Sequence, residues 1–353
     1  AGLLKPLAAK ELISTLKREL HVPLHLHTHD STGNGVSTVM MAAEAGVDIV
    51  DLAIESMSSL TSQPSMNAVA EALRGTRRDT GLKPEELTEL SHYYSRVREV
   101  YAPFESDMKS PNTEIYKYEI PGGQYSNLLA QVTSMGSPDD FEAIKGLYKD
   151  ANDLLGNIVK VTPTSKAVGD LAIFMYKNGL TKDNILTEGA GLSYPDSVVS
   201  YFQGMMGQPY GGFPKELQKI VLKDIKPLTE RPGALLPAVD LDQIKKDLCE
   251  KYHYEDRSEA DMCKKAVSYA LYPKVYEDYC EHFEIYNDVT RLESHVYFYG
   301  LRKGEETNLK IGEGKELLIK YLEASEPDED GYRTLMFQVN GSIRNVKILD
   351  KKL

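Results

Sequence analysis

Three histidines occupy alternate positions in the segment PLHLHTHD, residues 23–30: His25, His27 and His29. In a β-strand, residues i, i+2 and i+4 lie on one face, so the three imidazoles are expected to point the same way. Imidazole commonly binds divalent metals, and α/β enzymes place their chemistry at the carboxyl ends of strands. The spacing therefore favours a metal site over the alternative of hydrogen-bonded histidines near a strand end. Two histidines alone leave such a site incomplete, so further ligands are expected from elsewhere in the polypeptide.

A second group of candidate residues lies in VTPTSK, residues 161–166. One interpretation is structural: Thr162 caps a helix and Pro163 takes its first position. The other is functional: the hydroxyls of Thr162 and Ser165 and the ammonium of Lys166 are hydrogen-bond donors gathered at a helix N-terminus. Such a cluster suits an enolate-like or carboxylated group. The spacing alone leaves both interpretations open.

Alternating helices and strands surround the three histidines. Apolar periodicity predicts helices over 7–19, 35–47 and 66–73, strands over 22–27 and 48–54, and a polar loop over 56–65. The run DIVDLAI (48–54) is apolar enough for a parallel strand that is buried on both faces. A repeat of about 25 residues is typical of an α/β barrel or a doubly wound sheet. Two such units cannot close a barrel, so we expect earlier strands to precede residue 1.

Beyond these elements the apolar pattern changes twice. From about 85 to 290 it is helical and is interrupted by loops rich in proline and glycine. From about 294 the period becomes two, which predicts an antiparallel meander of about five strands. These strands are expected at 297–303, 307–311, 316–324, 333–339 and 342–349. Asn340-Gly341, between the last two, is a strong hairpin signal.

Composition excludes two classes of partner. The formal net charge of −12 over 353 residues argues against binding to a nucleic-acid backbone. No apolar run approaches the roughly 20 residues that a membrane span needs, so no membrane partner is expected. Cys249, Cys263 and Cys280 are scattered and lack CxxC spacing, which is typical of free thiols in a reducing compartment. We therefore expect a cytoplasmic protein.

Several long motifs follow one another in an order that resembles the carboxyltransferase component of the pyruvate carboxylase family, of the bacterial type. They are HLHTHDSTGNGV, AGVDIVDLA, SMSSLTSQPSMNA, PGGQYSNL, VKVTPTSKAVGDLA and GGFPKELQKIVLKD. The tail, with FYGLRKGEE and SEPDEDG, resembles the segment that follows this component in bacterial members.

The resemblance implies an α/β fold in three parts. Residues 1–80 would be the last strands and helices of a TIM-type (β/α)8 barrel. Residues 81–290 would form a mostly helical funnel region. Residues 291–353 would be a small antiparallel β segment of the tetramerisation or allosteric domain.

The resemblance also implies roles for individual residues. A divalent metal, manganese or zinc, would be held by His27 and His29, with His25 outside the ligand set. The family's other two ligands, a carbamylated lysine and an aspartate, would precede residue 1, because only AGLLKP remains of the stretch that carries the lysine. In VTPTSK, Thr162 would carry a proton, and Ser165 and Lys166 would contact biotin.

The activity that the resemblance implies is one half-reaction of the family. Carboxybiotin, delivered on a mobile carrier domain, would release CO2 in the site, and CO2 would be transferred to pyruvate to give oxaloacetate. Thr162 would relay a proton from pyruvate to biotin. The biotin carboxylase part, which uses ATP and bicarbonate, and the biotin carrier part would lie outside this chain. The chain alone is therefore expected to be inactive.

Partners and rival interpretations follow from the same resemblance. We expect a homotetramer with anaplerotic and gluconeogenic roles. Acetyl-CoA or cyclic di-AMP are the regulators to consider, although Lys10 stands where the cyclic di-AMP-binding members are expected to have a tyrosine. A rival within the fold is the carboxyltransferase subunit of oxaloacetate decarboxylase or transcarboxylase. A hypothesis of another class is a module for oligomer assembly and allosteric communication.

Overall fold

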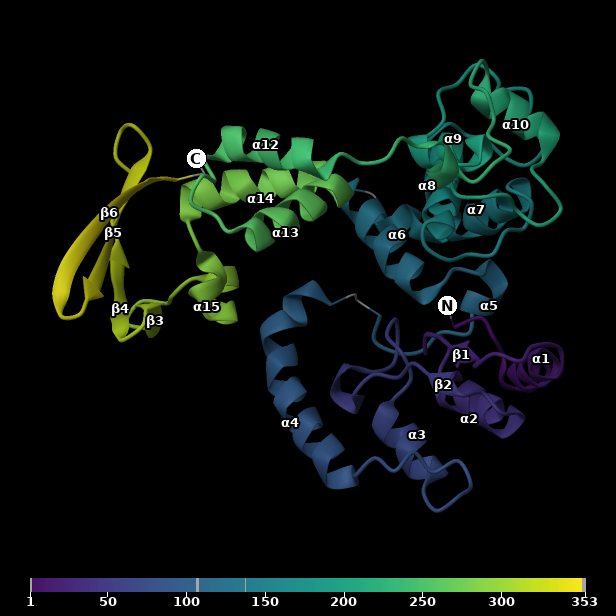
Figure 1. The fold of residues 1–353 in the computed structure, drawn as a ribbon, viewed down its shortest axis with the longest axis horizontal. Coiled ribbons are helices and arrows are strands. Elements are labelled where there is room, and N and C mark those ends of the chain that lie inside the picture. Colours follow the sequence, from purple (N-terminus) through teal and green to yellow (C-terminus); the bar gives the residue numbers. More distant parts are fainter. Residues whose placement is uncertain (1, 106–107, 137, 351–353) are drawn as a thin grey trace. The chain divides into compact units, whose positions relative to one another are not determined.

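The computed structural model describes residues 2–105, 108–136 and 138–350. The chain forms two compact units, one up to Leu236 and the other from Pro237 onwards (Figure 1). Among the described helices, none combines the length and the apolar character that a membrane crossing needs.

The first unit opens with the α/β elements that the sequence predicts. They are α1 (Pro6–Glu19), β1 (His25–Leu26), α2 (Gly35–Ala45), β2 (Ile49–Val50), the 3-10 helix η1 (Glu55–Met57) and α3 (Met66–Leu73). β1 and β2 pair in parallel, with His25 opposite Ile49 and Leu26 opposite Val50. The three predicted helices and the parallel strands are therefore confirmed, although both strands are shorter than predicted.

The prediction that residues 48–54 are buried on both faces is wrong for the described chain. Ile49 is 49% exposed, because the described sheet has only two strands here and nothing covers the outer side of β2. The inner side is well packed: Leu24 and Leu26 join Ala9, Ile13 and Val39 in one buried cluster. That cluster fixes β1 against α1 and α2, and it therefore sets the direction of His25 and of the segment after β1 that carries the other two histidines.

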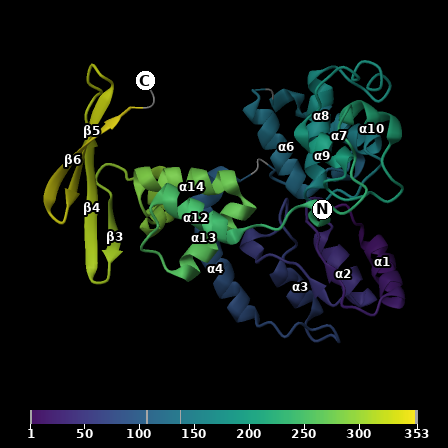
Figure 2. The same cartoon turned by 45° about the horizontal axis from the view of Figure 1, so that its top comes forward.

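The rest of the first unit is helical. Its elements are α4 (Pro84–Tyr101), η2 (Ala102–Phe104), α5 (Ile115–Tyr118), α6 (Gly122–Ser134), η3 (Pro138–Asp140), α7 (Phe141–Leu154), α8 (Thr164–Lys177), α9 (Asp196–Gln203), α10 (Lys215–Leu222) and α11 (Pro232–Leu235). Helices α6 to α10 lie together (Figures 1 and 2). Their shared core includes Leu128, Ile144, Tyr148, Leu171 and Met175, all fully buried. Each such side chain stabilises the fold by about 1.5–3 kcal/mol. The core makes α6 and α8 rigid supports for whatever lies between them.

The second unit has a helical part and a sheet. Its elements are α12 (Leu241–Tyr252), α13 (Glu259–Leu271), α14 (Pro273–Tyr286), η4 (Val289–Arg291), α15 (Ser294–Tyr299), β3 (Glu306–Gly312), β4 (Lys315–Ala324), β5 (Tyr332–Val339) and β6 (Ser342–Leu349). The side chains of Asp240 and Ser258 cap α12 and α13. A separate buried cluster that contains Leu248, Met262 and Tyr276 joins these helices.

The strands of the second unit form an antiparallel sheet in the order β3-β4-β5-β6. The hairpin at Asn340-Gly341 is confirmed: both residues have positive φ, and Val339 pairs with Ser342. The prediction of five strands is wrong, because the described tail has four. Residues 297–303 are not in a strand; instead α15 forms and ends at Gly300, whose N–H donates to the carbonyl of Val296 and whose φ is +69°. The period of two predicted a strand here, but the helix and its glycine stop form instead.

Candidate active site

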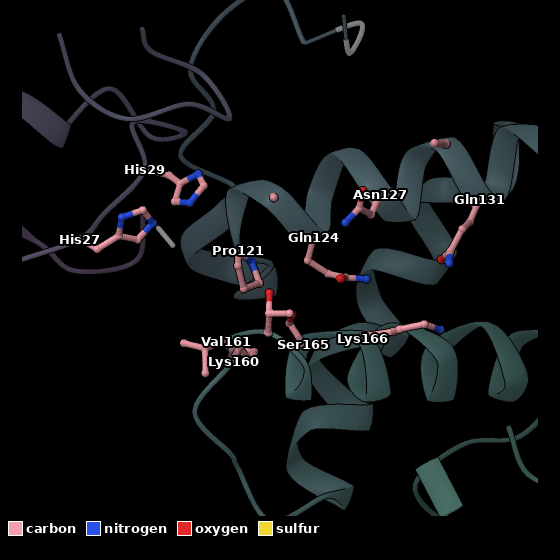
Figure 3. A pocket seen from close by; sticks show the side chains of 13 residues that line it. His27, His29, Pro121, Gln124, Asn127, Gln131, Lys160, Val161, Ser165 and Lys166 are labelled. Atoms are coloured by element: carbon pink, nitrogen blue, oxygen red, sulfur yellow. The ribbon is translucent and has the colours of Figure 1, made fainter. Parts of the chain in front are cut away.

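All the candidate residues of the sequence analysis except His25 line one cavity of about 670 Å³ in the first unit (Figure 3). His27 and His29 reach it from the segment after β1, Thr162 from the loop that leads into α8, and Ser165 and Lys166 from the first turn of α8. The remaining lining residues come from α6 and from the segments before it and before α8: Pro121, Gly123, Gln124, Asn127, Ala130, Gln131, Lys160 and Val161. Two motifs more than a hundred residues apart therefore share one site.

Each cavity histidine is held by its Nδ1 atom. Nδ1 of His27 donates to Oδ2 of Asp51 at 2.8 Å, and Nδ1 of His29 donates to the carbonyl oxygen of Thr61 at 2.5 Å. The two rings meet edge to face, with their centroids 5.3 Å apart and their planes at 83°. This bonding fixes the tautomer of each ring and leaves both Nε2 atoms as acceptors.

The charges of the neighbouring groups agree with this tautomer. Burial lowers the pKa of His29, so its ring stays neutral near pH 7. Hydrogen bonds from His25 and then His27 lower the pKa of the Asp51 carboxyl group, which keeps it ionised and able to accept both bonds. A neutral imidazole at His29 and an ionised carboxylate at Asp51 are forms that suit a metal ligand set.

The residues present fit a divalent cation as part of its ligand set. Neutral imidazoles with Nδ1 tied to an oxygen acceptor and Nε2 open are the usual arrangement of metal-binding histidines. Within residues 2–105, 108–136 and 138–350, no group of three or more His, Cys, Asp or Glu side chains is placed to hold a metal ion. His27 and His29 would be two of the ligands of such a cation.

The loop before α8 does not have the predicted capping arrangement. The helix begins at Thr164 with Pro163 in the capping position, and the side chain of Thr162 makes no capping hydrogen bond. The peptide bond between Thr162 and Pro163 is cis. Thr164 has the structural role instead: its hydroxyl donates toward the carbonyls of Val159 and Val161, both at 2.7 Å, and accepts from the N–H of Val161 at 3.2 Å.

Within the described residues, the hydroxyls of Thr162 and Ser165 do not form hydrogen bonds of this kind. In the part of the chain that the structure describes, the hydroxyls of Thr162 and Ser165 have no hydrogen-bond partner, and both residues line the cavity. Nζ of Lys166 donates to Oδ2 of Asp170 at 2.6 Å, and the same oxygen accepts from Oγ of Ser197. The loop and the first turn of α8 therefore present two unpaired hydroxyls and one cation that is held at the cavity wall.

Several residues of the site escaped the sequence analysis. Asp51 had a readable signal, because an acidic residue directly after a parallel strand faces the end of the neighbouring strand. The carbonyl of Thr61 had none, because a backbone atom leaves no trace in the sequence. Lys160, whose side chain is only 7% exposed, pairs with Glu119 at 2.9 Å and ties the loop before α8 to the segment before α6.

A row of amides along α6 was also missed. Gln124, Asn127 and Gln131 lie at helical spacing and line the cavity, as Figure 3 shows. Gln124 is 93% buried, and Oε1 of Gln131 is buried with no hydrogen-bond partner among the described residues. Helical periodicity marked α6 as a helix, but it could not tell which of its polar residues face inward.

Gly122 brings the start of α6 against the histidines. A Cβ atom at this position would lie 2.3 Å from Oγ of Ser31 and 3.2 Å from both Cβ and Nδ1 of His29. At Gly123 the nearest such contact, to Cε1 of His29, is 4.0 Å. The first glycine of PGGQY is therefore required, because it lets the start of α6 lie close to Ser31 and His29.

Comparison with known proteins finds a family match for each of the two parts of the chain that line the cavity. The family described as "Conserved carboxylase domain" matches residues 115–320, and the family described as "HMGL-like" matches residues 1–93. The chain is 47% identical over 353 residues to pyruvate carboxylase of Bacillus subtilis (strain 168) and 48% identical to that of Staphylococcus aureus (strain Mu50 / ATCC 700699). In both comparisons all of this chain is covered, together with 30% of the relative.

The solved structures give the same result. The carboxyl transferase domain of Rhizobium etli pyruvate carboxylase matches with a TM-score of 0.90 at 43% identity, covering 99% of this chain and 58% of that one. The same domain, solved with pyruvate and biocytin, matches equally well, with a TM-score of 0.90.

The fold and the sequence together define the class, which is a carboxyl transferase domain with α/β and helical parts and a small C-terminal antiparallel sheet. The chain belongs to the pyruvate carboxylase family. The family resemblance of the sequence motifs is thereby confirmed. The chain spans only 30% of the length of these curated relatives.

Proposed function

We propose that the chain forms part of the active site that transfers a carboxyl group from biotin to pyruvate, giving oxaloacetate. The family membership and the cavity support this proposal, as does the Rhizobium etli domain solved with pyruvate and biocytin. β1 and β2 would be the last strands of a TIM-type barrel whose other strands belong to the full-length polypeptide. The predicted ranges 1–80, 81–290 and 291–353 are the domain boundaries that we propose.

One observation carries the proposal: the unpaired hydroxyls of Thr162 and Ser165 and the histidines with open Nε2 atoms line the same cavity. Thr162 would move a proton between the two bound substrates, because its hydroxyl can donate and accept at once. Ser165 and Lys166 would bind the biotin group as donors. Asp170 and Ser197 would hold Lys166 in place.

His27 and His29 would hold a divalent cation, manganese or zinc. When bound, the cation would supply Lewis-acid polarisation of a carbonyl oxygen of the substrate. The walls that α6 and α8 form would keep water from the transferred group. The transfer requires these protein groups to be fixed before substrate arrives, which the two buried helices provide.

Thr162→Ala in the full-length protein tests the assignment of the proton carrier. Oxaloacetate formation should fall by about 10²- to 10⁴-fold, the usual contribution of a positioned acid–base group. Thr162→Ser, which keeps the hydroxyl, should retain most of the activity. Bicarbonate-dependent ATP cleavage, which belongs to the other half-reaction, should persist in both variants. Full oxaloacetate formation by Thr162→Ala would contradict the role.

Elemental analysis of the full-length protein tests the metal assignment. We expect about one manganese or zinc ion per chain, and loss of the ion when His27→Ala and His29→Ala are combined, because half of a four-ligand set is removed. His253→Ala, at an exposed position in the second unit, is a matched control. Full metal content in the double variant would refute the ligand pair.

Two rival functions are weaker. The subunit of oxaloacetate decarboxylase or transcarboxylase shares the fold, but the relatives compared here are pyruvate carboxylases. A role in oligomer assembly and allosteric communication would predict that Thr162→Ala alters the mass of the assembly while activity per assembly stays intact. Our proposal predicts that Thr162→Ala loses activity while the mass of the assembly stays unchanged.

The wider setting is part of the same proposal. The full-length protein would be a cytoplasmic homotetramer that also carries biotin carboxylase and biotin carrier parts and has anaplerotic and gluconeogenic roles. Acetyl-CoA is a candidate regulator, since the Rhizobium etli enzyme has been solved with it as an allosteric activator. Titration of the purified enzyme with acetyl-CoA and with cyclic di-AMP would test both regulators.

A further inference from the structure

The histidine that lies outside the proposed ligand pair has a defined partner. Nε2 of His25 donates to Oδ1 of Asp51 at 2.7 Å, and the other carboxylate oxygen, Oδ2, accepts from Nδ1 of His27 at 2.8 Å. One carboxylate therefore joins two imidazoles, one on each oxygen. No other hydrogen bond to this carboxylate is found in the described part of the chain.

The register of the parallel strands produces this arrangement. His25 pairs with Ile49 and Leu26 with Val50, and the N–H of Asp51 donates to the carbonyl of Leu26 at 3.0 Å. Asp51 is therefore the position opposite His27. His25 lies two residues before His27, on the same face of the strand. The alternate spacing of the histidines places both rings beside one carboxylate.

A carboxylate held at one oxygen alone can still rotate about its last side-chain bond. A second hydrogen bond to the other oxygen removes this freedom, so the acceptor for His27 keeps a fixed position. The acceptor in turn fixes both the tautomer and the ring orientation of His27. Since Nε2 of His25 is already bound to Asp51, that atom is not available to a cation.

We propose that His25 is a positioning residue for the metal centre, which acts on His27 through Asp51. This inference rests on the proposed function, in which His27 and His29 bind the cation. It gives a role to His25, the first histidine of HLHTHD, which is not one of the proposed ligands. The positioning role depends on the hydrogen bond from Nε2 of His25 to Asp51 and not on the shape of the imidazole ring.

The test is the dissociation constant of metal-free, full-length enzyme for manganese and, separately, for cobalt(II). His25→Phe keeps a ring of similar shape but loses the donor, so the dissociation constant should rise by about 10-fold, at the low end of what the loss of a partner of a metal ligand costs. His25→Gln restores a donor near the position of Nε2 and should recover most of the affinity. His21→Phe is the control, because His21 is exposed and forms no hydrogen bond or ion pair within the described residues.

A double-mutant cycle separates positioning from a general effect. Asp51→Asn should weaken metal binding by itself, and adding His25→Phe to it should cause little further loss, since both changes break one chain of bonds. The cobalt(II) absorption spectrum should keep its band positions in His25→Phe, because the ligands are unchanged. The proposal would be overturned if the two substitutions raised the dissociation constant for the metal by independent factors that multiply. It would also be overturned if His25→Phe bound the metal with unchanged affinity, or if His25→Gln bound it no better than His25→Phe.

Failure of this inference can be told from failure of the proposed function. If His27→Ala loses metal while His25→Phe binds it normally, the site stands and the role of His25 falls. If the spectrum of His25→Phe changes as that of His27→Ala does, His25 is itself a ligand and the positioning role is wrong. If His27→Ala keeps its metal, the proposed site itself is wrong. Should His25→Phe fail to fold, His25→Leu gives the same comparison with a smaller side chain.

Discussion

Within the loop 161–166, neighbouring hydroxyl groups have different bonding. Thr164 is tied to the backbone of Val159 and Val161, whereas Thr162 and Ser165 are unpaired and line the cavity. The sequence alone allowed Thr162 to be either a cap or a functional group. The structure removes the first interpretation, because the helix begins only at Thr164.

This difference predicts how Thr164 responds to substitution. Thr164→Val keeps the shape but removes the hydroxyl that donates to the carbonyls of Val159 and Val161, so the free energy of unfolding should fall by about 0.5–1.5 kcal/mol. Thr164→Ser keeps the hydroxyl and should lie close to the wild type. Chemical unfolding of the full-length protein, followed by hydrogen exchange at residues 159–166, measures both. Equal behaviour of the two variants would show that this hydroxyl does not hold the loop.

Also at the residue scale, the sequence could identify the site residues whose side chains have a chemical type suited to catalysis or metal binding. His27, His29, Thr162, Ser165 and Lys166 were found because imidazole, hydroxyl and ammonium groups in short motifs are rare and readable. Their roles remain predictions. Of the atoms that hold the histidines, the carbonyl of Thr61 belongs to the backbone and leaves no trace in the sequence, whereas Asp51 had a signal in its place directly after a parallel strand.

At the scale of elements, α6 must approach the strand that carries the histidines, and Gly122 permits it. Gly122→Ala should therefore push on Ser31 and His29 and destabilise the protein by about 1–3 kcal/mol, with weaker metal binding. Gly123→Ala is the matched control, because its added methyl group would meet only an ordinary contact at 4.0 Å. Thermal unfolding and metal titration of the full-length variants measure the effect. If the two alanine variants behave alike, the close approach does not constrain the site.

Helices of this chain were more predictable than its strands. Apolar periodicity located α1, α2 and α3 to within about two residues, because one face of each packs on a core. Strand ends depend on hydrogen bonds to a partner, so both β1 and β2 are shorter than the apolar runs that suggested them. At residues 297–299 the period of two favoured a strand, but these residues form the end of α15.

At the scale of the whole molecule, each compact unit has its own buried cluster. Leu171→Ala in the first unit and Leu248→Ala in the second should each cost about 2–5 kcal/mol, because both side chains are almost fully buried. Hydrogen exchange of the full-length protein should show faster exchange only in the unit that carries the change. The effects should add in the double variant, since the two leucines belong to different buried clusters. Faster exchange in both units after one substitution would mean that they unfold together.

The ion pairs along the cavity have a consequence for how the site captures its ligands. Lys160 is neutralised by Glu119 and Lys166 by Asp170, and the face that α6 contributes consists of uncharged amides. These paired lysines therefore add little field to draw an anion inward, and the chain as a whole carries a formal net charge of −12. Added salt should not slow the association of an anion, so recognition here would begin at contact, through shape and the exchange of water for amide and hydroxyl groups.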